Sequence, residues 1–404
     1  MKYIILIGDG MADYPLKELG GKTPLQVASK PHMDWIAAHG RSGLLKTIPE
    51  GMEPESDIAI MSILGYDPRA YHTGRGPLEA AGIGVELGKG DLAFRCNLIT
   101  EQDGILVDYS GGHISNDEAG ELMKEVRQTF GELGEFHLGV SYRHVFVIRD
   151  APAEAEQLKT WPPHEIVGRP IEDYLIEPKE LEISRVLNSM VLKSKEVLSK
   201  HPVNLRRVKS GKNPANMIWF WSQGKKPALP SLHERYGLKG AVLSEVTLVK
   251  GLGACAGMEK IEVPGATGYY DTSYESFAER GLRALDTYDL ILIHVEAPDE
   301  AGHEGNVEEK IKAIENLDSR LLGKLLDGIK EEYTIAILSD HPTPISKRVH
   351  VPDPVPFSIF SPNEQSDEVK AFDENSARKG SFGLLEGTRF MEKFLGMKHY
   401  KKEI

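Results

Sequence analysis

Three apolar segments, far apart along the chain, share one pattern: each is made almost entirely of apolar residues and leads into acidic or histidine residues. They are Tyr3–Ile7, Tyr288–Val295 and Tyr333–Ser339. Continuous apolar runs, as opposed to alternating ones, predict strands that are buried on both faces, as in a parallel sheet covered by helices. Glu308–Lys330 repeats its apolar residues at helical spacing and predicts a crossover helix. We therefore expect an α/β fold with a mainly parallel sheet.

The middle of the chain, from about Asp91 to Arg235, has a different pattern. Short apolar stretches and a longer polar helical pattern follow one another there, at Ala93–Leu98, Asn116–Gln128, Val145–Ile148 and Met217–Trp221. Strands of the first kind resume at Gly240–Val249. We therefore predict a smaller α/β domain at residues 89–235, inserted into a core domain that combines residues 1–88 and 236–404.

Composition and charge exclude several classes of partner and structure. With 48 Lys and Arg against 61 Asp and Glu, the formal net charge is −13, and no basic block offsets it. This balance argues against nucleic acid or a membrane surface as a partner. The longest apolar runs fall far short of the roughly 18 residues of a membrane span, and Cys96 and Cys255 are too few for a disulfide framework. We expect a cytoplasmic protein and leave its oligomeric state open.

The apolar runs lead into a set of carboxylate and imidazole side chains. Ligands collect at the carboxyl ends of parallel strands, and these side chains follow such ends: Asp9, Asp299, His303, Asp340 and His341. Any one of the aspartates alone would equally fit a turn or a helix N-cap. With His350 in the following loop, the set provides six ligands, enough for two metal ions in one site. Mixed carboxylates and imidazoles suit Mn²⁺, Zn²⁺ or Co²⁺ better than Ca²⁺.

Ser56 is the candidate nucleophile. It lies two residues before the apolar, helix-periodic run Ile58–Leu64, and Gly65 ends that run. This position predicts a helix N-cap, and the free backbone N–H groups at the start of a helix also bind phosphate. A metal ion beside the hydroxyl would lower its pKa, as metal ions do for bound water. The structural and the catalytic interpretations of Ser56 are therefore compatible.

These candidates belong to short motifs that follow one another almost from end to end of the chain. One group of motifs contains the residues just described: Gly8–Gly10, Ser56–Asp57, Ala297–His303, Ser339–His341 and His350. A second group lies around them: Gly21–Leu25, Gly65–Pro68, Gly74–Pro77, Phe94–Asn97 and His294–Asn306. In this order the motifs resemble the alkaline-phosphatase superfamily and, within it, the archaeal-type branch of the cofactor-independent phosphoglycerate mutases. The resemblance implies an alkaline-phosphatase-like core domain with a two-metal site.

The resemblance also implies roles for the site residues. One metal ion would be held by Asp299, His303 and His350, and the other by Asp9, Ser56, Asp340 and His341. Ser56 would take up the phosphoryl group and return it, so that 3-phosphoglycerate and 2-phosphoglycerate interconvert through a phosphoserine intermediate. This reaction belongs to glycolysis and gluconeogenesis. For both sites the first expectation is Mn²⁺, with Zn²⁺, Co²⁺ and Mg²⁺ as alternatives.

A phosphorylated substrate needs cationic partners beyond the metal ions. Two divalent ions are balanced by three aspartates and a serine alkoxide, whereas a phosphate monoester brings a charge of about −1.5 to −2 and phosphoglycerate adds a carboxylate. We therefore expect basic residues around the substrate: Arg143, His144, Lys225, Lys226 and Lys250. Lys225 and Lys226 would equally fit solvated surface positions. His113 matches a substrate-contacting histidine of the family.

Departures from the family pattern keep other functions open. Glu55 precedes the candidate nucleophile where the family commonly has glycine, and Trp219–Lys226 lacks the arginine pair that longer mutases place after this strand. Val107–His113 resembles a branch proposed to phosphorylate homoserine. The alternatives are phosphotransfer from a nucleotide to a small alcohol such as homoserine, hydrolysis of a phosphomonoester and, in a different class, metal binding without catalysis.

Overall fold

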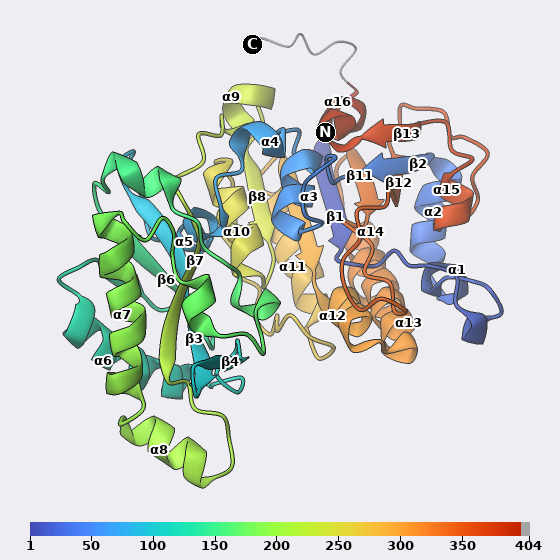
Figure 1. The fold of residues 1–404 in the computed structure, drawn as a ribbon. Coiled ribbons are helices and arrows are strands. Elements are labelled where there is room, and N and C mark those ends of the chain that lie inside the picture. The colour runs from blue at the N-terminus through green and yellow to red at the C-terminus, as the bar shows by residue number, and fades with distance from the viewer. Residues whose placement is uncertain (397–404) are drawn as a thin grey trace. The chain divides into compact units, whose positions relative to one another are not determined.

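The computed structural model describes residues 1–396 and divides into two compact units (Figure 1). Unit 1 combines Met1–His72 with the chain from Ala228 onward, and unit 2 is Thr73–Pro227. These bounds differ from the predicted 88/89 and 235/236. The first difference has a packing reason, because α5 (Arg75–Gly82) lies within unit 2, where Ala80 belongs to an apolar cluster with Val145 and Val147.

Unit 1 is built on an eight-stranded sheet in the order β13-β2-β12-β11-β1-β10-β8-β9. In chain order the strands are β1 (Lys2–Gly8), β2 (Arg41–Lys46), β8 (Gly240–Leu243), β9 (Glu259–Ile261), β10 (Leu290–Val295), β11 (Tyr333–Leu338), β12 (Val355–Phe360) and β13 (Gly383–Glu386). Neighbours pair in parallel except β12, which is antiparallel to β11 and β2. The three strands predicted from continuous apolar runs, β1, β10 and β11, are adjacent in this sheet. The α/β fold with a mainly parallel sheet is therefore confirmed.

The helices of unit 1 connect these strands. They are α1 (Pro24–Val27), α2 (Pro31–His39), α3 (Ser56–Ile63), α4 (Pro68–Tyr71), α9 (Leu232–Tyr236), α10 (Thr247–Cys255), α11 (Tyr274–Leu285), α12 (Ala297–Glu304), α13 (Val307–Asn316), α14 (Gly323–Gly328), α15 (Glu374–Ala377) and α16 (Phe390–Phe394). The predicted helix 308–330 is divided, because a π-helical turn at Leu317–Leu322 joins α13 to α14. The predicted strand Gly240–Val249 is too long. Ser244 Oγ accepts the Val246 N–H at 3.0 Å, so the chain turns after β8 and α10 begins at Thr247.

Unit 2 contains a five-stranded sheet whose paired strands are all antiparallel. Its strands are β3 (Leu92–Gln102), β4 (Ile105–Asp108), β5 (Glu135–His137), β6 (Arg143–Ile148) and β7 (Met217–Gly224). Besides α5, its helices are α6 (Asn116–Phe130), α7 (Glu182–Leu198) and α8 (Pro202–Lys209). The core of this unit contains Phe94, Phe146 and Phe220, together with apolar residues of α6 and α7. The strands and the helix predicted here correspond to β3, β6, β7 and α6.

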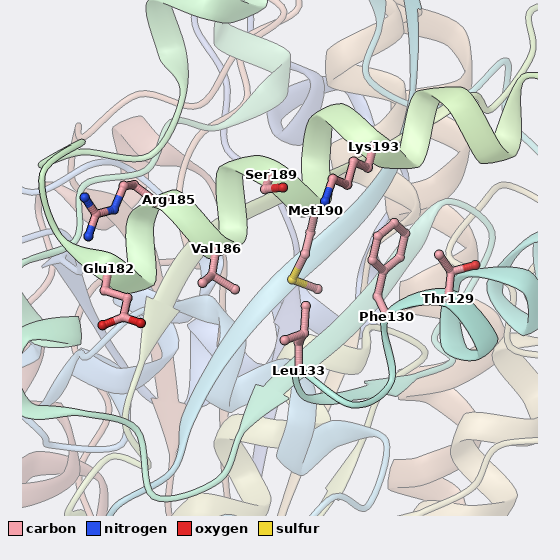
Figure 2. Close-up of a pocket in the computed structure, with 9 residues that line it drawn as sticks. All are labelled: Thr129, Phe130, Leu133, Glu182, Arg185, Val186, Ser189, Met190 and Lys193. Carbon is pink, nitrogen blue, oxygen red and sulfur yellow. The ribbon is translucent and has the colours of Figure 1, made fainter.

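A groove beside α7 is visible in unit 2 (Figure 2). It is lined by Thr129, Phe130, Leu133, Glu182, Arg185, Val186, Ser189, Met190 and Lys193. None of the site residues expected from the sequence lines it. Within residues 1–396, no helix is both long enough and apolar enough to cross a membrane.

A buried ion pair joins the loops that follow β1 and β11. Lys310 of α13 is fully buried, and its Nζ lies 2.8 Å from Asp13 Oδ2. The same Nζ donates to the carbonyl oxygens of Ala12 at 3.4 Å and Thr343 at 2.8 Å. Asp13 also accepts the Ile345 N–H at 3.1 Å. Each charge is therefore neutralised and hydrogen-bonded, and removing either one would leave the other uncompensated inside the protein.

We predict that Lys310→Met lowers the free energy of unfolding by about 3–5 kcal/mol, because it leaves a buried Asp13 carboxylate without its cation. The matched control is Lys312→Met on the same helix, whose side chain is 65% exposed and which should change stability by less than about 0.5 kcal/mol. Urea unfolding followed by circular dichroism measures both. Equal unfolding midpoints for the two variants would contradict the role assigned to the buried pair.

Candidate active site

The sheet order of unit 1 brings three predicted site segments to one edge. β1 lies between β10 and β11, with Gly8 opposite Val295 and Ile7 opposite Leu338. The strands are parallel, so their carboxyl ends lie next to one another. Asp9 directly follows β1, Asp340 follows β11 after one residue, and Asp299 is in the first turn of α12, which follows β10. The predicted assembly of the strand-end carboxylates is therefore present.

The first group consists of Asp9, Asp340 and His341, whose potential ligand atoms all lie within 4.8 Å of one another. His341 Nε2 lies 3.5 Å from Asp9 Oδ1 and 3.5 Å from Asp340 Oδ2. All three residues are buried, and these two carboxylate oxygens lack a hydrogen-bond partner among the described residues. Burial, together with the charge of Asp340, raises the pKa of Asp9. Buried, unpartnered carboxylate oxygens beside an imidazole nitrogen fit a divalent cation.

The second group consists of Asp299, His303 and His350. His303 Nε2 lies 2.9 Å from His350 Nε2 and 3.0 Å from Asp299 Oδ2, and His350 Nε2 lies 3.5 Å from Asp299 Oδ1. The other ring nitrogens face backbone carbonyls, with His303 Nδ1 3.0 Å from Arg348 O and His350 Nδ1 2.8 Å from Pro54 O. Such bonds place the proton on Nδ1 and leave each Nε2 lone pair free for a metal ion.

The two groups are connected to each other. His341 also lies within 4.8 Å of the ligand atoms of Asp299 and His350, and Thr343 Oγ1 donates a hydrogen bond to Asp299 Oδ1. Gly10 has a φ of +57°, and a Cβ at this position would come within 2.3 Å of Asp299 Oδ1. Both the backbone conformation and the space therefore require glycine here. All six predicted Asp and His ligands thus lie together at one edge of the sheet.

Ser56 lies beside the first group, with its Oγ 3.1 Å from His341 Nε2. The prediction that it caps a helix is wrong by one position, because Glu55 occupies the N-cap and Ser56 is the first residue of α3. Glu55 makes no side-chain capping bond; its Oε2 lies 3.5 Å from His350 Nδ1. The Ser56 hydroxyl therefore lies beside the candidate metal ligand His341 and does not cap the helix.

His294 is a site residue that the sequence analysis did not select. It is fully buried on β10, and its Nε2 lies 3.2 Å from Asp9 Oδ2 and 3.8 Å from Asp340 Oδ2. Burial acts to lower the pKa of His294, but Asp340 raises it above the usual value. The sequence contained one signal, a polar residue next to the end of an apolar strand. His294 can orient the carboxylates of Asp9 and Asp340 through its ring nitrogen.

The basic residues expected around the substrate are divided between the two units. Lys250 belongs to unit 1, where its Nζ lies 3.4 Å from Glu262 Oε1. In unit 2, Lys225 forms an ion pair with Glu156, and Lys226 is exposed. These positions fit the surface interpretation of Lys225 and Lys226.

The remaining three predicted substrate residues lie in unit 2. His144 is 2% exposed, burial lowers its pKa to about 3, and its Nδ1 lies 3.2 Å from the Gly139 N. A buried, neutral histidine of this kind is a core residue and supplies no positive charge. Arg143 and His113 are exposed and both lie near Tyr142, with the Arg143 Cζ 5.4 Å and the His113 ring 6.5 Å from the Tyr142 ring centroid. They remain candidates.

Comparison with known proteins identifies matching families and relatives. Residues 37–204 match a family model described as 2,3-bisphosphoglycerate-independent phosphoglycerate mutase, and residues 172–358 match one described as type I phosphodiesterase / nucleotide pyrophosphatase. A 2,3-bisphosphoglycerate-independent phosphoglycerate mutase of Methanothermobacter thermautotrophicus is 52% identical, over 97% of this chain and 96% of the relative. The Methanosarcina barkeri enzyme of the same name is also 52% identical, over 96% of this chain and 98% of the relative.

Two solved structures are also similar to this chain along nearly its whole length. A protein from Pyrococcus horikoshii has a TM-score of 0.85 at 32% identity, over 98% of this chain and 96% of the other. The cofactor-independent phosphoglycerate mutase of Thermoplasma acidophilum has a TM-score of 0.65 at 29% identity, over 99% of this chain and all of the other. Given this similarity along nearly its whole length, the chain belongs to the family of 2,3-bisphosphoglycerate-independent phosphoglycerate mutases.

Proposed function

We propose that this chain is a metal-dependent isomerase that interconverts 3-phosphoglycerate and 2-phosphoglycerate through a phosphoserine at Ser56. The relatives that match it along nearly their whole length carry the name of this activity. The observation that carries the proposal is the position of Ser56 Oγ, 3.1 Å from His341 Nε2 at the start of α3. A hydroxyl in this position, beside buried acids suited to a cation, supports the role of Ser56 as the nucleophile.

The donor set supports two divalent ions. Asp9, Ser56, Asp340 and His341 would hold one, and Asp299, His303 and His350 would hold the other. Carboxylate, hydroxyl and imidazole ligands together suit Mn²⁺ first, with Zn²⁺, Co²⁺ and Mg²⁺ as alternatives. A divalent ion in this position would supply positive charge that favours the serine alkoxide and binds phosphate oxygens. The partly unpartnered carboxylates of Asp9 and Asp340 favour this assignment.

The residues of the chain then divide the transfer into two steps. In the first, Ser56 Oγ loses its proton and attacks phosphorus, the bond between phosphorus and the C3 oxygen of 3-phosphoglycerate breaks, and that oxygen takes up a proton and becomes a glycerate hydroxyl. In the second, the C2 oxygen of glycerate loses its proton and attacks phosphorus, the bond between phosphorus and Ser56 Oγ breaks, and Oγ takes up a proton and becomes the serine hydroxyl again. Covalent catalysis allows the glycerate to reorient between the steps. The backbone N–H groups at the start of α3 are suited to hold phosphate oxygens in both.

A small phosphorylated substrate is sufficient for this reaction. The proposal therefore includes no nucleic-acid or membrane partner, and it places the protein in the cytoplasm, where phosphoglycerate is formed. Incubation with 3-phosphoglycerate and Mn²⁺, followed by detection of 2-phosphoglycerate, tests the activity directly. A parallel incubation with ATP and homoserine tests the alternative, and formation of phosphohomoserine without any 2-phosphoglycerate would contradict the mutase assignment.

The nucleophile has its own test. Ser56→Ala should reduce turnover by about a thousandfold or more and change unfolding stability by less than about 0.5 kcal/mol, because the Ser56 side chain does not cap α3. Ser62→Ala, on the same helix and 1% exposed, is the matched control and should retain activity. Mass spectrometry of acid-quenched wild-type enzyme should find phosphate on the peptide that contains Ser56. An unmodified peptide, together with an active Ser56→Ala variant, would exclude the phosphoserine.

Metal dependence is expected to appear in stability as well as in activity. Chelation should abolish turnover and Mn²⁺ should restore it, and Mn²⁺ should raise the unfolding temperature by several degrees, since a ligand at 100 times its Kd stabilises by about 2.7 kcal/mol. Asp340→Asn should lose most of this increase, whereas Asp327→Asn, a change at an exposed residue of α14, should keep it. Full turnover after exhaustive chelation would contradict the proposed metal site.

A further inference from the structure

One face of α7 lines the open groove of unit 2 that Figure 2 shows. The residues that α7 contributes to this groove are three or four positions apart, so they form a single stripe along the helix. We call them the α7 stripe: Glu182, Arg185, Val186, Ser189, Met190 and Lys193. At 1.5 Å per residue, this stripe is about 16 Å long.

The middle of the α7 stripe is apolar and partly exposed. Met190 is buried in the core of unit 2, whereas Val186 is 36% exposed. Leu133, in the turn that follows α6, also lines the groove and is 48% exposed. Figure 2 shows Val186 and Met190 pointing from α7 toward Leu133. Covering these exposed side chains with another apolar surface would be favourable, because it removes apolar area from water.

The two ends of the α7 stripe carry opposite charges. Glu182 is in the first turn of α7, and Lys193 lies about three turns further along the helix. Both side chains are exposed, and within residues 1–396 neither has a hydrogen-bond or ion-pair partner. The helix dipole favours an acidic residue at the first of these positions. It does not account for the exposed apolar surface between the two charges.

A stripe of this composition is complementary to itself. If a second copy of α7 lies antiparallel on the first, a twofold axis at the middle of the stripe exchanges its two ends. Glu182 then lies opposite Lys193 of the second copy, and this contact occurs twice. Val186 lies opposite Ser189 of the second copy, whose small side chain leaves room for it. A parallel arrangement in the same register would instead place like charges opposite each other.

Arg185 fits the same antiparallel arrangement. It would lie opposite Met190 of the second copy, where the apolar part of the arginine side chain can cover the groove while its guanidinium group stays in water. Arg185 is also one turn from Glu182 on the same helix. Each Glu182 carboxylate would therefore lie between two cations, which makes it the residue on which the charge balance of the contact depends.

We propose that the α7 stripe is the contact surface of a homodimer, in which α7 of two copies packs antiparallel with Glu182 of each copy against Lys193 of the other. The charge pattern of the stripe and its exposed apolar centre together favour a second copy of this chain as the occupant of the groove. The contact is short, which is typical of small, transient interfaces. The inference concerns assembly and does not depend on the proposed function.

Sedimentation velocity of the full-length protein at about 10–500 µM, the range in which a small interface is expected to associate, tests the proposal. Wild type should show an equilibrium between monomer and dimer. Glu182→Lys places like charges opposite each other at both ends of the stripe, so the Kd of the dimer should rise about tenfold or more. Glu154→Lys is the matched control: it makes the same change of charge at an exposed residue of unit 2 outside the groove, and the Kd should stay at the wild-type value.

The reverse change at the other end of the stripe provides a rescue. Lys193→Glu alone should weaken the dimer less than Glu182→Lys does, because Arg185 still neutralises part of the added negative charge. Combined with Glu182→Lys in one chain, it restores opposite charges at both ends. An equal mixture of the two single variants restores them as well, in a heterodimer. Both the double variant and the mixture should therefore associate with a Kd close to that of wild type.

The outcomes are distinct from one another. A wild-type protein that stays monomeric over the whole concentration range would overturn the proposal. A dimer whose Kd is unchanged in Glu182→Lys would also overturn it, because another surface would then form the interface. Weaker association of Glu182→Lys without rescue by Lys193→Glu would exclude the antiparallel pairing. Circular dichroism of each variant checks that the fold is kept, and formation of 2-phosphoglycerate tests the proposed function separately.

Discussion

Mutual repulsion among buried carboxylates is the constraint on which the rest of unit 1 depends. Ligand oxygens of Asp9 and Asp340 lie within 4.8 Å of each other, in a place where both residues are almost completely buried. At that separation two negative charges repel by about 3.5 kcal/mol at an effective dielectric constant of about 20. The surrounding structure keeps them close: parallel strands fix the backbone, and His294 stands beside both carboxylates. A site held together against its own charge has a strong preference for a cation.

Much of this arrangement follows from local patterns in the sequence. Asp9, Asp299 and Asp340 could be grouped because continuous apolar runs predict parallel strands, and parallel strands place their carboxyl ends together. The antiparallel insertion of β12 between β11 and β2 could not be predicted, since it depends on which strands pair over long distances. The start of α10 at Thr247 was missed because an apolar run of this length fits a strand and a helix equally well.

The predicted substrate-binding residues show a second limit on what can be inferred from the sequence. Neighbouring side chains on a strand point to opposite faces, so Arg143 and His144 could not both have faced the same ligand; the structure leaves Arg143 exposed and buries His144. Arg95 lies in the motif Phe94–Asn97, but its environment comes from Trp221 and Glu79, which only strand pairing and helix packing bring close. The candidate metal ligands carry a local signature in the sequence, whereas the contacts of a strand residue such as Arg95 do not.

The insertion of unit 2 has a consequence for how the chain acquires its structure during synthesis. β1 is complete at Gly8, but its partners β10 and β11 end only at Val295 and Leu338. At the usual 5–20 residues per second, the intervening stretch of about 330 residues takes a ribosome roughly 15 to 65 seconds. Until β10 has been made, the apolar strand that leads into Asp9 has no neighbours in its sheet, whereas Thr73–Pro227, whose strands pair among themselves, has already emerged in full. The inserted unit can therefore fold first, and the sheet next to the candidate metal ligands is completed last, when β10 and β11 pair with β1.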